Sequence, residues 1–240
     1  MGKKERVDKI LSNLGYGSRK EIKSFVKQGM ISVGNELIKD SSIKVDPTVE
    51  EIYFEGEKVY YREFIYLMLN KPQDVVSSTN DPISKTVLDL IDSKYLAFNP
   101  HPAGRLDKDT EGLLLITNDG KLSHELLSPK KNVKKTYYVE VDGYVDEKYF
   151  EVFESGIVLD DGYKTKPAKL EIIESGYVSK VYLTISEGKY HQVKRMFESL
   201  EMNVLYLKRI SMGSLVLDDS LQPGEYRELS DEEVLLLKKS

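Results

Sequence analysis

Residues 102–120 of this 240-residue chain read PAGRLDKDTEGLLLITNDG. The first half of the stretch is polar and punctuated by Gly104 and Gly112, and the second half begins with the apolar run 113–116. We expect a loop that leads into a buried strand, which ends at the turn signal Asn118-Asp119-Gly120. Because loops at the end of a rigid strand often position reactive side chains, the stretch predicts a core strand with a candidate site beside it.

Two carboxylates lie in this loop, Asp107 and Asp109, and the cations Arg105 and Lys108 stand next to them. A neighbouring cation stabilises the charged carboxylate, which is the form that a nucleophilic aspartate needs. The same pattern also fits a turn that Asp107 or Asp109 caps and Arg105 neutralises, because aspartate is common in turns. Spacing alone favours the turn.

Upstream, apolar residues recur at i, i+3, i+4 and i+7 between positions 6 and 14, which predicts one helix ended by Gly15. Ser18 and Glu21 have the spacing of a capping box, so a second helix begins there and ends at Gly29. Strands are predicted at 30–33, 36–38 and 52–54. These elements form a unit of roughly sixty residues, near the lower size limit for independent folding.

The second helix has a basic stripe made of Lys20, Lys23 and Lys27, with Arg19 beside it. Such a stripe is most simply a solvated helix face. The alternative is an edge that contacts the phosphates of a nucleic acid.

Three segments of this unit, RVDKIL at 6–11, GSRKE at 17–21 and QGMISV at 28–33, resemble the S4 domain, a small RNA-binding module. The resemblance implies that the basic stripe contacts RNA. The hairpin turn departs from the usual Asn-Gly order, since it reads Gly34-Asn35. We therefore expect an S4-like domain at 1–58, a linker at 59–61 and a second domain at 62–240.

The second domain combines strands and helices without strict alternation, which predicts an α+β fold on a largely antiparallel mixed sheet. The predicted strands are 65–69, 113–117, 137–141 and 181–185, and the predicted helices are 122–127 and 191–200.

Composition limits the chemistry. The chain has no cysteine, and its three histidines show no metal-ligand spacing, so we expect neither a thiolate nucleophile nor a metal site. No apolar run is long enough to cross a bilayer and no signal peptide is visible, which predicts a cytoplasmic protein without a membrane partner.

The net charge of −5 does not exclude a polyanionic partner, because charge is unevenly distributed. Residues 1–47 carry ten Lys or Arg against six Asp or Glu, whereas residues 212–240 carry three against seven.

The central stretch, as GRLDxxTxGLLLITNDG at 104–120, resembles the signature of the RsuA/RluB family of ribosomal RNA pseudouridine synthases. Asp74 departs from the family pattern, which has glycine there. Further family-like segments are LNKP at 69–72, KTYYVEV at 135–141, DGYKTKPA at 161–168, EGKYHQVKRM at 187–196 and LQPGEYR at 221–227.

The resemblance implies that Asp107 is the catalytic aspartate and that no cofactor or metal takes part. It implies that Tyr137 packs against the target base and that Lys194 pairs with the aspartate, with Arg195 as the alternative partner. Arg105 would assist RNA binding or extrusion of the base, which costs a few kcal/mol.

Other positions remain open. Leu183 or Ile185 would form the apolar floor under the uracil, and core packing is the equal alternative for both. Asp109 is expected to be a local turn or cap residue. His191 and Gln192 are expected to be structural or to contact RNA.

The resemblance therefore implies an enzyme that isomerises a uridine in ribosomal RNA, acting as a monomer and on RNA within an assembly intermediate. The compact length and the PGEYR ending favour 16S over 23S RNA as the substrate. The alternatives are a 23S-specific synthase and a non-catalytic S4-domain protein of ribosome assembly.

Overall fold

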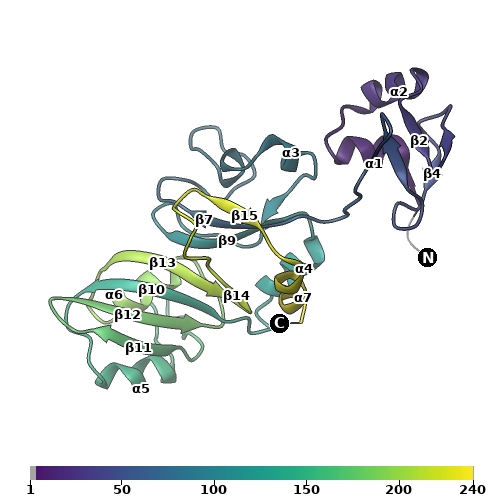
Figure 1. The fold of residues 1–240 in the computed structure, drawn as a ribbon. Helices are drawn as coiled ribbons and strands as arrows, with labels where there is room; N and C mark the ends of the chain where they lie inside the picture. Colours follow the sequence, from purple (N-terminus) through teal and green to yellow (C-terminus); the bar gives the residue numbers. More distant parts are fainter. Residues whose placement is uncertain (1–3, 240) are drawn as a thin grey trace. The chain divides into compact units, whose positions relative to one another are not determined.

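The computed structural model describes residues 4–239, which form two compact units (Figure 1). The first comprises the chain up to Ile65 together with residues 91–100, and the second comprises residues 66–90 and the chain from His101 onward.

The first unit combines short helices with small antiparallel sheets around one apolar cluster. Its four-stranded sheet has the order β3-β2-β5-β6, and β1 pairs with β4. The helices are α1 (Val7–Asn13), α2 (Arg19–Lys27) and α3 (Ser93–Leu96). The strands are β1 (Glu5–Arg6), β2 (Ile31–Val33), β3 (Glu36–Leu37), β4 (Lys44–Val45), β5 (Ile52–Phe54) and β6 (Glu57–Lys58). The predicted helix pair and hairpin are confirmed.

Helix α2 begins at the predicted capping box. The Glu21 amide donates to Ser18 Oγ at 3.3 Å, and the Ser18 amide donates to Glu21 Oε2 at 2.7 Å. Ile22 and Val26 are buried in the apolar cluster, and Gly29 follows the helix with φ of 73°. Local sequence signals thus determine both ends of this helix.

The boundary of the first unit lies beyond the predicted one. Val59, inside the predicted linker 59–61, is only 5% exposed and belongs to the apolar cluster, against which Tyr61 also packs. The unit therefore ends near Ile65, not at residue 58. Residues 91–100 also group with it, although the sequence assigned them to the second domain.

The second unit is built on one mixed sheet with the order β11-β12-β10-β13-β9-β7-β15, to which β14 and β8 add at β13 and β9. Among the named strands of its described part, every pairing is antiparallel except that of β13 with β9, which confirms the predicted sheet. The strands are β7 (Tyr66–Lys71), β8 (His101–Pro102), β9 (Glu111–Thr117), β10 (Lys135–Asp142), β11 (Lys169–Glu174), β12 (Val178–Ile185), β13 (Val204–Met212), β14 (Leu215–Val216) and β15 (Tyr226–Glu228).

Helices cover parts of this sheet, and α5 packs on β11 (Figure 1). The helices are η1 (Val87–Leu90, a 3-10 turn), α4 (Gly120–Leu127), α5 (Lys148–Ser155), α6 (Gln192–Glu198) and α7 (Asp231–Leu237). The α4 and α6 predictions are confirmed, whereas α5, α7 and β13 were not predicted. No helix within residues 4–239 is both long and apolar enough to traverse a bilayer.

The parallel junction between β9 and β13 depends on Gly112. Its φ is 103°, and a Cβ atom there would lie 2.2 Å from the carbonyl oxygen of Arg209 and 2.8 Å from its amide nitrogen. The strands can approach this closely only because residue 112 has no side chain. The glycine of the central motif thus brings β13 beside the Asp107 loop.

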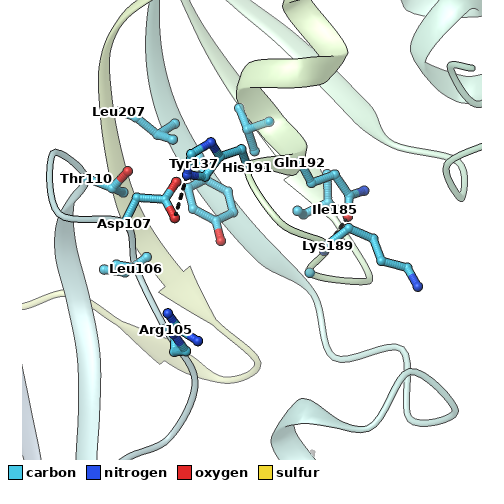
Figure 2. A pocket seen from close by; sticks show the side chains of 12 residues that line it. Arg105, Leu106, Asp107, Thr110, Tyr137, Ile185, Lys189, His191, Gln192 and Leu207 are labelled. Atoms are coloured by element: carbon cyan, nitrogen blue, oxygen red, sulfur yellow. Dashed lines mark hydrogen bonds and ion pairs between the residues drawn. The ribbon is translucent and has the colours of Figure 1, made fainter. Parts of the chain in front are cut away.

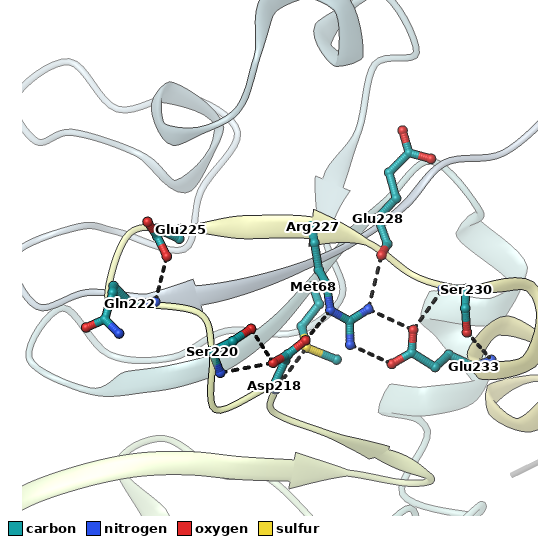
Figure 3. A network of polar contacts seen from close by, with 9 residues as sticks. All are labelled: Met68, Asp218, Ser220, Gln222, Glu225, Arg227, Glu228, Ser230 and Glu233. Carbon is teal, nitrogen blue, oxygen red and sulfur yellow. Dashed lines mark hydrogen bonds and ion pairs between the residues drawn. The ribbon is translucent and has the colours of Figure 1, made fainter.

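Arg227 ties the C-terminal segment together (Figure 3). Its Nε donates to Asp218 at 2.6 Å, and its two terminal nitrogens donate to the two Glu233 oxygens at 2.8 Å each. Hydrogen bonds from Ser220 and then from Arg227 lower the pKa of Asp218 to about 2. This network links β15 to the start of α7, whose residue Leu237 is buried in the core.

Candidate active site

Asp107 lies in the loop between β8 and β9, at a solvent-open pocket of about 450 Å³ (Figure 2). About a third of its side chain is exposed, so the carboxylate is accessible from the pocket. The residues that line the pocket are Arg105, Leu106, Asp107, Thr110, Tyr137, Ile185, Gly188, Lys189, His191, Gln192, Val193 and Leu207.

Lys71, at the end of β7, fixes the backbone of this loop. Its fully buried amine donates to the carbonyl oxygens of Thr110 at 2.8 Å, Pro72 at 2.9 Å and Lys108 at 3.3 Å. Burial lowers the pKa of Lys71 to about 8, although the loop carboxylates act in the opposite direction. Two of these three acceptors, Thr110 and Lys108, belong to the loop, so the buried lysine is a strong positional restraint on it.

Ser77 and Asp74 hold the same loop from a neighbouring segment. Ser77 Oγ accepts from the Leu106 amide at 3.0 Å and donates to the Leu106 carbonyl at 2.8 Å. The Asp74 amide donates to the Lys108 carbonyl at 2.9 Å. Asp74 has φ of 63°, a conformation that aspartate adopts more readily than most residues, so this departure from the family pattern leaves the loop intact.

Lys194, on α6, contacts both loop carboxylates, but unequally. Its amine donates to both oxygens of Asp109 at 2.7 Å and lies 3.8 Å from Asp107 Oδ2. Partial burial would raise the pKa of Asp109, but the hydrogen bond and charge of Lys194 outweigh it and the pKa is lowered. Asp109 is therefore more than the local turn residue that the sequence suggested, because it anchors this lysine.

Arg195, the alternative partner of Asp107, is engaged elsewhere. Its Nε donates to Asp160 at 2.7 Å and its Nη2 lies 2.7 Å from Asp161. The hydrogen bonds that Arg195 donates to Asp161 and then to Asp160 raise the pKa of Arg195. Of the two basic residues, Lys194 is thus the one beside Asp107.

His191 provides a second nitrogen close to Asp107. Its Nε2 lies 3.6 Å from Asp107 Oδ1, and its ring stacks on Tyr190 with centroids 3.8 Å apart. Figure 2 shows the imidazole turned toward the carboxylate. The residue has φ of 50°, so the backbone is held in the left-handed region to present the ring.

Buried Glu187 holds the segment that carries His191. It accepts hydrogen bonds from Gln192 Nε2 at 3.0 Å, from the Lys166 amide at 2.9 Å and from the Tyr163 hydroxyl at 2.7 Å. Gln192 in turn accepts from the Lys189 amide at 2.9 Å. The role of Gln192 here is structural, one of the two expected.

The strand β10 directs alternate side chains to opposite faces, as predicted. Tyr137 lies in the pocket, whereas the hydroxyl of Tyr138 donates to Glu140 on the other face. Leu183 pairs directly opposite Tyr137 but is fully buried and does not line the pocket. Of the two candidates for the apolar floor, Ile185 is the one that lines the pocket, near the Tyr137 ring (Figure 2).

The other candidate binding residues separate into two places. Arg105 lines the pocket, whereas Arg19, Lys20, Lys23 and Lys27 are exposed on α2 of the first unit. None of these four forms a salt bridge with another residue of the part that the structure describes. Within that same part, the side chains do not gather three His, Asp or Glu residues that could hold a metal ion.

Sequence reasoning gave no role to Lys71, Ser77, Glu187 or Arg209. Lys71 does carry a recognisable signal, because it is a charged residue that ends a largely apolar strand, whereas Glu187 follows a strand of alternating apolar and polar residues and carries none. Ser77 has no such signal, since its partner lies 29 residues away.

Two family models match the chain. Residues 65–199 match the model of RNA pseudouridylate synthase, and residues 5–50 match that of the S4 domain.

Full-length relatives agree with these matches. The chain is 53% identical to an uncharacterized RNA pseudouridine synthase of Bacillus subtilis, over 98% of both chains. It is 43% identical to ribosomal small subunit pseudouridine synthase A of Haemophilus influenzae, over 98% of this chain and all of the relative. A crystal structure of a pseudouridylate synthase superposes with a TM-score of 0.68 at 42% identity, over 97% of this chain and 99% of that one.

Proposed function

This chain belongs to the RNA pseudouridylate synthase family, and from that premise we propose that it isomerises a uridine of 16S ribosomal RNA with Asp107 as nucleophile. Its substrate is RNA and its product differs from the substrate only in how uracil is joined to ribose.

One observation carries the assignment of Asp107: it is the single acidic residue among the described residues that line the pocket. A carboxylate can act as a covalent nucleophile if it is charged and accessible. Lys194 Nζ lies 3.8 Å from its Oδ2, and His191 Nε2 lies 3.6 Å from its Oδ1. Asp109 is the less suitable of the two acids, because Lys194 engages both of its oxygens.

The remaining lining residues fit a flat, partly apolar base. Tyr137 offers a ring against which uracil can stack, and Ile185 supplies an apolar wall. In the reaction the N1–C1′ bond breaks and a C5–C1′ bond forms, while a proton leaves C5 and N1 gains one. The pocket must hold the freed uracil while it turns, which is the role that we assign to Tyr137 and Ile185.

The choice of 16S RNA rests on the likeness to ribosomal small subunit pseudouridine synthase A of Haemophilus influenzae. The S4-domain match at 5–50 supports a second RNA contact, for which Arg19, Lys20, Lys23 and Lys27 supply exposed charge.

The test is turnover by the purified protein on 16S and 23S transcripts and on small-subunit assembly intermediates. Release of tritium from [5-³H]uridine measures the reaction, and carbodiimide mapping locates the product. We expect modification of 16S RNA by the wild-type protein and none by Asp107→Asn, with RNA binding retained. Modification of 23S RNA alone would redirect the substrate assignment, and turnover by Asp107→Asn would remove the nucleophile assignment. No turnover on any RNA would favour a non-catalytic RNA-binding role.

A further inference from the structure

Two buried cations, Arg209 on β13 and Lys135 on β10, face a cavity that adjoins the Asp107 pocket. Arg209 is 2% exposed and Lys135 is 6% exposed. The solvent-open cavity measures about 1070 Å³ and shares Arg105, Asp107 and Tyr137 with the pocket.

The sheet determines where these two cations lie. Lys135 precedes Tyr137 by two residues on β10, and both are buried on the same face of the strand. Arg209 is the cross-strand partner of Tyr137 in the β10–β13 pairing. Both cations therefore flank the residue that we assign to the target base.

Their hydrogen-bonding capacity is largely unused. Arg209 Nε donates to the Leu113 carbonyl at 2.8 Å, but its Nη2 is buried without a partner in the described part of the chain. The Lys135 amine has three protons and donates to the Val133 carbonyl at 3.1 Å. Neither forms a salt bridge with a described carboxylate.

Two buried like charges are costly without a counter-ion. Burial and, to a smaller extent, the charge of Arg209 lower the pKa of Lys135 to about 8. A bound anion would relieve both costs. The cavity favours an anion, since its lining holds one carboxylate, Asp107, against the cations Arg105, Lys135, Lys189 and Arg209.

We propose that Arg209 and Lys135 bind a phosphate group that flanks the target uridine. A nucleotide whose base lies against Tyr137 has its own phosphates only one ribose away from that ring. A fixed guanidinium with a free donor suits a phosphate oxygen, because such charge-assisted bonds are strong and directional. The inference rests on the proposed function for the identity of the base, but not for the choice of ribosomal RNA.

The test measures how much a phosphate improves binding of a nucleoside to the full-length protein. Uridine, uridine 5′-monophosphate and uridine 3′-monophosphate are titrated separately, and affinity is measured by saturation-transfer NMR. We expect one of the two nucleotides to bind about tenfold tighter than uridine or better. Which nucleotide gains affinity identifies the phosphate that occupies the site.

Arg209→Met and Lys135→Met should each reduce the ratio of nucleotide affinity to uridine affinity toward one, while the affinity for uridine stays unchanged. Arg209→Lys should keep part of the advantage. The matched control is Lys208→Met, which removes the same charge from the opposite face of β13 and should leave the advantage unchanged. Thermal melting checks the fold of each variant, and Lys135→Met serves if Arg209→Met fails to fold.

An equal affinity of wild-type protein for uridine and both nucleotides would overturn the proposal, and that comparison needs no variant. An advantage that persists in both methionine variants would also overturn it. The outcome is separable from the proposed function: a protein without turnover on ribosomal RNA could still show the phosphate preference, and an active synthase could lack it.

Discussion

The amine of Lys194 donates to both carboxylate oxygens of Asp109, at 2.7 Å each. This pairing fixes a cation 3.8 Å from Asp107, the proposed nucleophile. Asp109 thus acts on the site through Lys194, and a positioning role of this kind can be separated from a chemical one.

Asp109→Asn should slow the single-turnover rate of pseudouridine formation about ten- to a hundredfold, because small displacements of a positioned group cost rates of this order. RNA affinity, measured by filter binding, should stay near the wild-type value. Asp160→Asn is the control, since it removes an exposed acid paired with neighbouring Arg195 and should leave the rate unchanged. An unaltered rate in Asp109→Asn would limit that residue to the structure of its loop.

Gly112→Ala should destabilise the protein by about 3 kcal/mol or more, because the new Cβ meets both the carbonyl oxygen and the amide of Arg209 and the backbone has positive φ. The control is Gly162→Ala, in which φ is 81° and nothing lies within 4 Å of the added Cβ. Urea unfolding of both variants separates the clash from the cost of the backbone conformation. Equal losses would mean that β9 and β13 can move apart without penalty.

The elements that the sequence predicted are those that local chemistry specifies. Helix α2 carries its capping box and apolar face within its own residues, and β9 is announced by its apolar run and the following turn. Strand β13 was missed because its apolar and polar residues do not alternate clearly along the sequence. Its place in the sheet depends on pairing with β10 and β9.

The site shows the same division. Asp107, Tyr137 and Lys194 were named from motif resemblance, and the structure brings all three to one pocket or its edge. Partners could not be read from the chain in the same way. Lys194 pairs with Asp109 across 85 positions, and Arg209 reaches Leu113 across 96. Pairings over such distances depend on the sheet order, which periodicity does not reveal.

The C-terminal network predicts a specific acid response. The pKa of Asp218 lies near 2, below its ordinary value of 3.8, and the pKa of Glu233 is also lowered, chiefly by Arg227. Because both folded-state pKa values lie below the ordinary values of 3.8 for Asp218 and 4.5 for Glu233, this stabilisation is fully present above about pH 5 and is lost as the pH falls toward 2. Arg227→Met should therefore flatten the fall of the unfolding free energy between pH 5 and pH 2.

Urea unfolding of wild type and Arg227→Met at pH 7, 5, 4, 3 and 2 measures that difference. The comparison cancels acid effects from the rest of the chain, because only the pairs of Arg227 differ. Curves that run parallel from pH 7 to pH 2 would show that Asp218 and Glu233 are not stabilised by this arginine.

The basic stripe of α2 is expected to contribute to RNA binding. Lys20, Lys23 and Lys27 are exposed, and none is paired with another described residue. If they contact phosphates, replacing all three with Gln should weaken binding of ribosomal RNA and reduce the slope of log K against log salt by roughly 2. Fluorescence anisotropy at salt concentrations from about 50 mM to about 300 mM gives both the affinity and the slope. In this range the salt dependence of binding reports the phosphate contacts.

A control with the same change of charge tests whether position matters. Lys148, Lys169 and Lys180 each form a salt bridge with a nearby acid, at 3.2, 2.6 and 2.7 Å. Because these lysines are already neutralised locally, their triple Gln variant should keep the wild-type slope. If both triple variants lose affinity equally, net charge alone governs binding and the α2 stripe is an ordinary solvated face. If only the α2 variant loses affinity, the first unit binds RNA through this helix.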